Sequence, residues 1–244
     1  MYKYTHEVRG YETDMFAQVP PSMLVRMAVE AATLASVEEG VSREFIFPAL
    51  GAVWMLSRLE LRQSRVIRDG ERLRIDATYI EATSVSYLRR LIFSVDGEPA
   101  AVCDMESIVV DFDKRRILRP EVLLPLIKEH VRDDNEEQPV PVHRLRVSGE
   151  LEHIRDIEVR RYDCDLNGHL TAPRYADYVC ECSGYWDETP KMCEYLHIEY
   201  SGESRPGERL NIFASGESKK MLMKAVREDG KAAFSAEIRT ADMQ

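Results

Sequence analysis

The 244-residue sequence lacks any long hydrophobic run. Its most apolar stretches are interrupted by Arg or Glu, so none reaches the roughly 20 apolar residues that a membrane helix needs. The opening segment, MYKYTHEVRGYE, has neither the apolar core of a signal peptide nor the Arg-rich and Ser-rich character of a transit peptide. We therefore expect a cytoplasmic protein with no membrane partner.

Cysteine is scarce, and neither cysteine nor histidine shows the spacing of a metal site. The cysteines are odd in number and form no CxxC pair, which predicts reduced thiols. His143, His153 and His197 are scattered along the chain, so we expect no metal site. The five cysteines are Cys103, Cys164, Cys180, Cys182 and Cys193.

The chain has an excess of acidic residues. Its formal net charge of -10 and pI near 5.2 argue against a nucleic-acid partner. Several basic runs interrupt this balance, and we interpret them as solvated surface, with docking of an acidic or phosphate-bearing partner as the alternative. These runs are Arg58-Arg62-Arg65-Arg68, Arg89-Arg90, Lys114-Arg115-Arg116 and Lys219-Lys220.

What the sequence does contain is an α+β pattern that occurs twice. A strand over about Tyr2 to Val8 precedes a proline pair, and a helix over about Met23 to Glu38 follows, with Ser22 as its expected cap. Strand-like runs then form an antiparallel meander with Asp-Gly turns. We expect these runs near Ala52 to Val66, Arg72 to Glu81, Ser86 to Val95 and Ala100 to Val110.

The same order of elements returns after a charged, proline-containing segment. We predict a first domain over residues 1–112, a linker over 113–141 and a second domain over 142–244. In the second domain a strand near Val142 to Val159 precedes a helix, whose apolar residues from Ala172 to Trp186 share one face. The expected later strands lie near Tyr195 to Tyr200, Arg209 to Gly216, Lys219 to Arg227 and Ala232 to Arg239.

The two halves also match residue by residue, which indicates a duplication. Asp14 aligns with Asp165 at an offset of 151 residues (165 − 14), as do the neighbouring positions of the first strand. Further along, Gly70 aligns with Gly207 in a repeated Gly-Glu-Arg-Leu at an offset of 137 residues (207 − 70). The second copy therefore has a loop about 14 residues shorter.

Polar side chains in the second copy predict a site. Asp165, Asn167 and His169 alternate just before the second helix, and side chains two apart project the same way from an extended segment. Together with free backbone N–H groups at the helix start, they would converge on one point. The duplication serves as a control, because Asp165 has Asp14 as its counterpart, whereas Asn167, His169 and Glu203 are replaced by other residues in the first copy. Asn167 aligns with Phe16, His169 with Gln18 and Glu203 with Val66.

We therefore expect one site per chain, in the second half, although each residue has a structural alternative. His169 could be a satisfied structural histidine, Asp165 could form the same turn as Asp14, and Glu203 could be a solvated charge. Cys164 alternates away from the site, and we interpret it as a packing residue.

The chain resembles the acyl-acyl carrier protein thioesterases over nearly its whole length. The resemblance rests on Asp165-x-Asn167-x-His169 and Glu203, with supporting matches at Arg160, Tyr175, Trp54, Arg58 and Lys114-Arg115-Arg116-Ile117. It implies a tandem double hotdog fold, in which each half is a helix wrapped by an antiparallel sheet. It also implies hydrolysis of fatty acyl-acyl carrier protein to free fatty acid, ending fatty acid synthesis, with no cofactor or metal. The implied catalytic residues are Asp165, Asn167, His169 and Glu203.

Two departures from the family pattern bear on mechanism. His169-Leu170-Thr171-Ala172 replaces the usual His-Val-Asn-Asn, so contacts made by those asparagines are lost. Ser204 follows the glutamate where many plant members have cysteine, which disfavours a cysteine nucleophile.

Several choices stay open. Glu203 or Asp165 with His169 could activate water, or Asp165 could attack the thioester directly. Backbone N–H donors of the second helix would hold the developing negative charge. We expect the acyl chain beside the apolar helix of the first domain. An acyl-CoA thioesterase and a non-catalytic acyl-thioester binding or sensing module are the alternative functions, and a homodimer is one option for the assembly.

Overall fold

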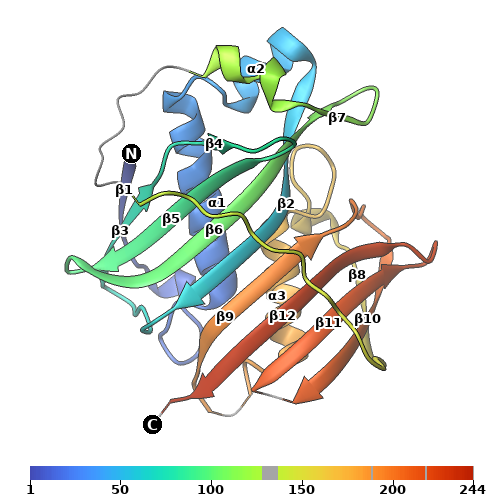
Figure 1. Ribbon diagram of the computed structural model, residues 1–244. Coiled ribbons are helices and arrows are strands. Elements are labelled where there is room, and N and C mark those ends of the chain that lie inside the picture. The colour runs from blue at the N-terminus through green and yellow to red at the C-terminus, as the bar shows by residue number, and fades with distance from the viewer. Residues whose placement is uncertain (128–136, 188, 218, 244) are drawn as a thin grey trace.

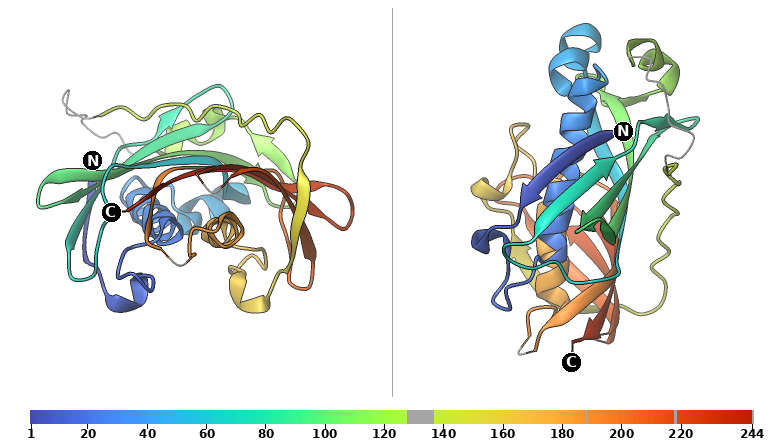
Figure 2. Two further views of the ribbon diagram at one scale, coloured as in Figure 1. Left: turned by 90° about the horizontal axis from the view of Figure 1, so that it is seen from below. Right: turned by 90° about the vertical axis from the view of Figure 1, so that its left-hand side faces the viewer.

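The computed structural model describes residues 1–127, 137–187, 189–217 and 219–243. Within these residues, twelve strands form one continuous, wholly antiparallel sheet that curves around two helices (Figures 1 and 2). Helix α1 (Pro21–Glu38) and helix α3 (Ala172–Ser183) lie side by side in the hollow of the sheet. Residues 137–151, the crossing segment that leads into the second half, run over the opposite, convex face.

The strand order reveals the duplication. It runs β1-β3-β5-β6-β2-β9-β12-β11-β10-β8, so the second half mirrors the first about the β2/β9 pair. The first half contains β1 (Tyr2–Glu7), β2 (Ala52–Gln63), β3 (Arg72–Ala77), β4 (Glu81–Ala82), β5 (Tyr87–Val95), β6 (Glu98–Asp111) and β7 (Arg116–Leu118). The second contains β8 (Glu152–Glu158), β9 (Lys191–Tyr200), β10 (Arg209–Glu217), β11 (Lys220–Arg227) and β12 (Ala232–Asp242).

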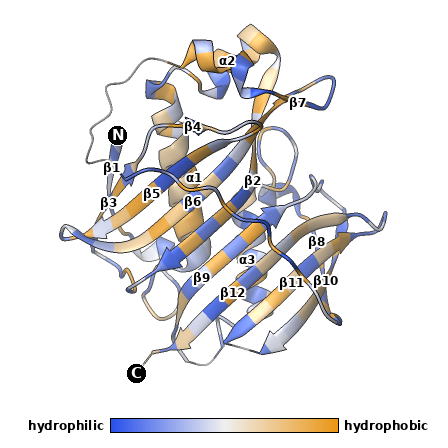
Figure 3. Ribbon diagram, viewed as in Figure 1, coloured by the Kyte–Doolittle hydropathy of each residue, from blue (hydrophilic) through white to orange (hydrophobic). Residues whose placement is uncertain are grey.

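Two strands from different halves join the sheet at its centre. β2 pairs with β9 so that Leu59 lies opposite Ile198 and Leu61 opposite Leu196, and all four side chains are fully buried. Successive side chains of a strand point to opposite faces, so this apolar set faces the helices and the residues between it face outward. Polar and apolar residues accordingly alternate along the central strands (Figure 3). One hydrophobic core therefore spans both halves.

The expected α+β double hotdog is confirmed, with local corrections. Ser22 does not cap the first helix, because the helix begins at Pro21, a position that proline favours, and Ser22 is buried inside it. An additional helix, α2 (Arg43–Leu50), precedes β2. The expected strand at 142–159 is ordered as β8 only from Glu152.

The segment predicted as a linker carries some structure of its own. It contains β7 and two short 3-10 turns, Pro120–Val122 and Leu124–Leu126. Residues 128–136 of this segment lie outside the described residues. No helix in the described part of the chain is long and apolar enough to cross a membrane.

The β2/β9 pairing leads to a stability prediction. Leu61→Ala should lower the free energy of unfolding by about 2 to 5 kcal/mol, because it leaves a cavity in the core shared by both halves. Urea denaturation followed by circular dichroism measures this change. Met15→Ala is the control, since Met15 is 78% exposed and its loss should matter little. Equal unfolding midpoints for the two variants would contradict a shared core at this position.

Candidate active site

The segment before α3 is a tight turn and not the extended strand that the alternating polar residues suggested. The Asp165 carboxylate accepts hydrogen bonds from the backbone N–H groups of Asn167, at 2.8 Å, and His169, at 3.4 Å. The Asp165 N–H in turn donates to the His169 carbonyl at 2.8 Å. Gly168 completes the turn with a φ of +75°, a conformation that glycine adopts without steric cost. The expectation of an extended segment was wrong because an aspartate can satisfy the backbone itself.

The first half contains the same turn with different side chains. The Asp14 carboxylate accepts from the N–H groups of Phe16, at 2.9 Å, and Gln18, at 3.2 Å. The Asp14 N–H donates to the Gln18 carbonyl at 2.9 Å, as Asp165 does to His169. The backbone is thus common to both copies, and the asparagine and histidine are specific to the second.

A histidine and a glutamate meet beside this turn. His169 Nε2 lies 3.2 Å from Glu203 Oε2, and both side chains are largely buried. Glu203 belongs to the connection between β9 and β10, where Arg227 Nη1 donates to its backbone carbonyl at 2.6 Å. The structure therefore brings together two residues that the sequence separates by more than thirty positions.

The first half also reaches the glutamate. Arg115, in the turn between β6 and β7, donates from Nη1 to Glu203 Oε1 at 2.8 Å. The carboxylate therefore contacts His169 with one oxygen and Arg115 with the other. Sequence reasoning did not assign a role to Arg115, although the Lys114-Arg115-Arg116-Ile117 match had marked this turn.

A cleft of about 260 Å³ runs between the halves and contains all four predicted site residues. One wall comes from β2 of the first half and the other from the turn and helix start of the second. Asn167 is exposed here, and its side-chain amide donates weakly to Asp165 Oδ2 at 3.4 Å. The walls include Val53, Trp54, Met55, Leu56, Arg115, Asp165, Asn167, His169, Ala172, Tyr175, Tyr200 and Glu203.

The corresponding position in the first half is closed. Gln18, the counterpart of His169, is buried, and its side-chain amide donates to the Lys191 carbonyl at 2.9 Å and to the Tyr185 hydroxyl at 3.2 Å. Both partners come from the second half. The space that faces the cleft in one copy is therefore filled by protein in the other.

The helix start offers fewer donors than the sequence suggested. The N–H of Leu170 donates to the Ser204 carbonyl at 2.8 Å, and that of Thr171 to the Asp163 carbonyl at 3.0 Å. Pro173 has no N–H. Ala172 is the first residue of α3 and lines the cleft, and its N–H has no partner within the helix because of its position. Among residues 170–173, the Ala172 N–H is therefore the candidate donor to a ligand.

The fold and this cleft define the class of double hotdog proteins with a polar site at the junction of their halves. Residues 1–123 match the family model of the acyl-ACP thioesterase N-terminal domain, and residues 148–241 match that of the C-terminal domain. The chain belongs to the acyl-ACP thioesterase family, and the expected thioester hydrolase acting on acyl-acyl carrier protein is confirmed. No curated protein sequence matches the chain.

Solved structures share the fold over the full length of the chain. An acyl-ACP thioesterase from Bacteroides thetaiotaomicron is similar with a TM-score of 0.81 and 15% identity, covering 98% of this chain and 97% of its own. A 12:0-ACP thioesterase from Umbellularia californica has a TM-score of 0.78 and 16% identity, covering 99% and 97%. At these identities the likeness concerns the fold.

The cysteine beside the turn should not act as a nucleophile. Burial, together with the neighbouring Asp163 and Asp165 carboxylates, raises the pKa of the Cys164 thiol, so the thiolate fraction at neutral pH is lower than for a free cysteine. Cys164→Ser should therefore keep thioester hydrolysis within about threefold of the wild-type rate.

The raised pKa of Cys164 also predicts how its alkylation rate depends on pH. The alkylation rate of Cys164 by iodoacetamide should be low at pH 7 and should still be rising above pH 9, because only the thiolate reacts. Peptide mass spectrometry after timed alkylation measures this rate for each cysteine. Fast alkylation of Cys164 at pH 7, with loss of activity, would argue for a cysteine mechanism.

Proposed function

We propose that the chain releases free fatty acid from acyl-acyl carrier protein by means of a water molecule activated by His169 and Glu203. The observation that carries this mechanism is the contact of His169 Nε2 with Glu203 Oε2 at 3.2 Å inside the cleft. A carboxylate beside one ring nitrogen keeps the proton on that nitrogen and leaves the other to accept a proton. In this arrangement Nδ1 of His169 is the general base.

The proposed reaction has two steps. Water loses a proton to His169 and its oxygen attacks the carbonyl carbon, while Glu203 stabilises the imidazolium that forms. The Ala172 N–H and the Asn167 side-chain amide are the donors proposed for the negative oxygen of the tetrahedral intermediate. The carbon–sulfur bond then breaks, and the departing sulfur takes the proton from His169. Arg115 keeps Glu203 in place through its contact at 2.8 Å.

For Asp165 we propose a structural role in the site. Its carboxylate already accepts two backbone N–H groups, and its other oxygen faces the Asn167 amide. These contacts direct the carboxylate at the turn. The identical use of Asp14 in the first half supports this role over direct attack on the thioester.

The acyl chain needs an apolar surface beside the polar residues. The cleft wall supplied by the first half comes from β2, with Val53, Trp54, Met55 and Leu56, and among the described lining residues none belongs to α1. We therefore propose that the chain lies against β2 of the first domain rather than beside α1, where sequence reasoning had expected it.

We further propose that the protein acts in the cytoplasm on acyl carrier protein that carries a phosphopantetheine-linked acyl group. All five cysteines are free in the structure, which suits a reducing compartment. We propose a homodimer as the assembly. Size-exclusion chromatography with light scattering measures the molar mass that tests this.

Substitution of the cleft residues tests the function. His169→Ala and Asn167→Ala should each lower kcat on acyl-acyl carrier protein by about a hundredfold or more, with little change in Tm, because they remove the base and an oxyanion donor. His153→Ala is the control, since His153 lies on β8 and pairs with Asp156 outside the cleft. Near-normal rates in both cleft variants would remove the proposal.

The same assay separates the alternative functions. Rates are compared for one acyl group attached to acyl carrier protein and to CoA. A preference for CoA would overturn the assignment of the substrate, and tight binding without hydrolysis would favour a binding or sensing module.

A second pair of variants distinguishes Glu203 from Asp165. Glu203→Gln should lower kcat about a hundredfold, because an amide cannot stabilise the imidazolium. Asp165→Asn should stay within about tenfold of wild type, since asparagine forms the same turn through its side-chain oxygen. Steady-state kinetics on acyl-acyl carrier protein measures both. An Asp165→Asn variant as slow as Glu203→Gln would point instead to direct attack by Asp165.

A further inference from the structure

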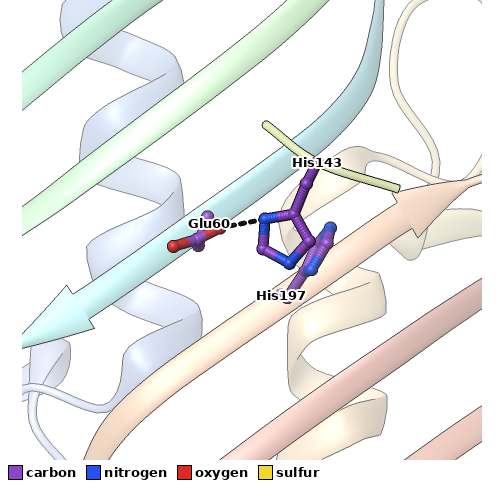
Figure 4. Close-up of side chains that lie close together, drawn as sticks. All are labelled: Glu60, His143 and His197. Carbon is purple, nitrogen blue, oxygen red and sulfur yellow. Dashed lines mark ion pairs between the residues drawn. The ribbon is translucent and has the colours of Figure 1, made fainter. Parts of the chain in front are cut away.

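Three side chains with metal-binding atoms meet outside the cleft, on the convex face of the sheet (Figure 4). They are Glu60 of β2, His197 of β9 and His143 of the segment that crosses this face. One potential ligand atom from each residue lies within 4.8 Å of the others. None of the three lines the cleft described above.

The register of the sheet explains why they meet. Glu60 and His197 are direct partners in the β2/β9 ladder, so their side chains stand next to each other. Their neighbours Leu61 and Leu196 face the core, and the alternation of a strand turns Glu60 and His197 outward. His143 lies over this pair, with its Nδ1 3.3 Å from Glu60 Oε2 and its ring centroid 5.0 Å from that of His197.

His197 carries an unsatisfied polar atom. Its side chain is fully buried, and among the described residues Nε2 has no hydrogen-bond partner, whereas Nδ1 lies 3.5 Å from the Tyr195 hydroxyl. A buried polar atom without a partner costs free energy, so its retention calls for an explanation. A ring nitrogen of a neutral imidazole is a common metal ligand, and Nε2 of His197 is such an atom without a hydrogen-bond partner among the described residues.

We propose that Glu60, His143 and His197 form a binding site for a divalent transition metal ion, with Zn²⁺ as the best match. Two imidazoles and one carboxylate are a known zinc ligand set, with ligand distances of about 2.0 to 2.2 Å. The three ligand atoms lie within 4.8 Å of one another and would have to move closer together around an ion. The His143 side chain has room to move because it is 66% exposed. Solvent reaches the site on the same side.

The surrounding charges limit how the ion can bind. Arg62 pairs with Oε1 of Glu60, so Oε2 is the oxygen left for the metal. The Glu199 carboxylate oxygen Oε2 accepts a hydrogen bond from the backbone N–H of Leu145 at 3.0 Å. This bond holds the crossing segment against β9 near the site. The ion would thus connect the first half, the second half and the crossing segment at one point.

The spacing of histidines in the sequence did not predict this site. His143 and His197 are far apart along the chain, and Glu60 lies in the other half. Only the pairing of β2 with β9 and the path of the crossing segment bring them together.

Zinc titration of the full chain tests the proposal. Chelator-treated protein is titrated with Zn²⁺ at pH 7 by isothermal titration calorimetry, and Tm is measured with and without the ion. We expect one Zn²⁺ per chain and a Tm rise of about 5 °C or more when free Zn²⁺ exceeds Kd a hundredfold. His143→Gln should weaken binding at least tenfold. Because His143 is exposed, this variant should fold normally.

Two controls identify the site. His153→Gln removes another exposed histidine paired with a carboxylate, at 2.7 Å from Asp156, and should leave the Zn²⁺ affinity unchanged. His169→Ala should also bind Zn²⁺ normally, which excludes the cleft. Absence of Zn²⁺ binding to wild type, or equal affinity of wild type and His143→Gln, would overturn the proposal. His197→Gln is the second ligand variant and should also weaken Zn²⁺ binding. If it does not fold, Glu60→Gln replaces it and should weaken binding in the same way.

Discussion

The antiparallel pairing of β2 with β9 is the constraint on which the rest of the structure depends. It turns two sheets into one and places Leu61 and Leu196 in a common core. On the inner side it brings β2 of the first half against the turn that carries His169, so that the cleft has two walls. On the outer side it sets Glu60 beside His197. Neither feature belongs to one half alone.

In the turn before α3, some residues form the backbone structure common to both copies, and others supply the side chains proposed for catalysis. Both copies build it with an aspartate that accepts two backbone N–H groups. One copy adds a histidine that faces a cleft. The other adds Gln18, whose side-chain amide donates hydrogen bonds to the Lys191 carbonyl and the Tyr185 hydroxyl. The difference in function is therefore a difference of side chains on a shared backbone.

Much of this could be predicted from the sequence because it is local. Apolar residues marked α1 and α3, although not the short α2, and the offset between the copies marked the turn. The rest depends on contacts between distant segments. Arg115 lies in a turn of the first half, and nothing near it in sequence shows that it meets Glu203. The alternation of Asp165, Asn167 and His169 fits an extended strand as well as a turn, and only the hydrogen bonds distinguish them.

The mirrored strand order has a consequence for how such a protein can change. In a symmetric dimer of identical subunits, every substitution is made twice and both equivalent positions must tolerate it. A single chain that contains both units is free of this coupling. One copy can then fill its position with Gln18, which binds to the other half, while the other keeps an open cleft with His169. Covalent linkage thus allows two structurally equivalent places to specialise independently.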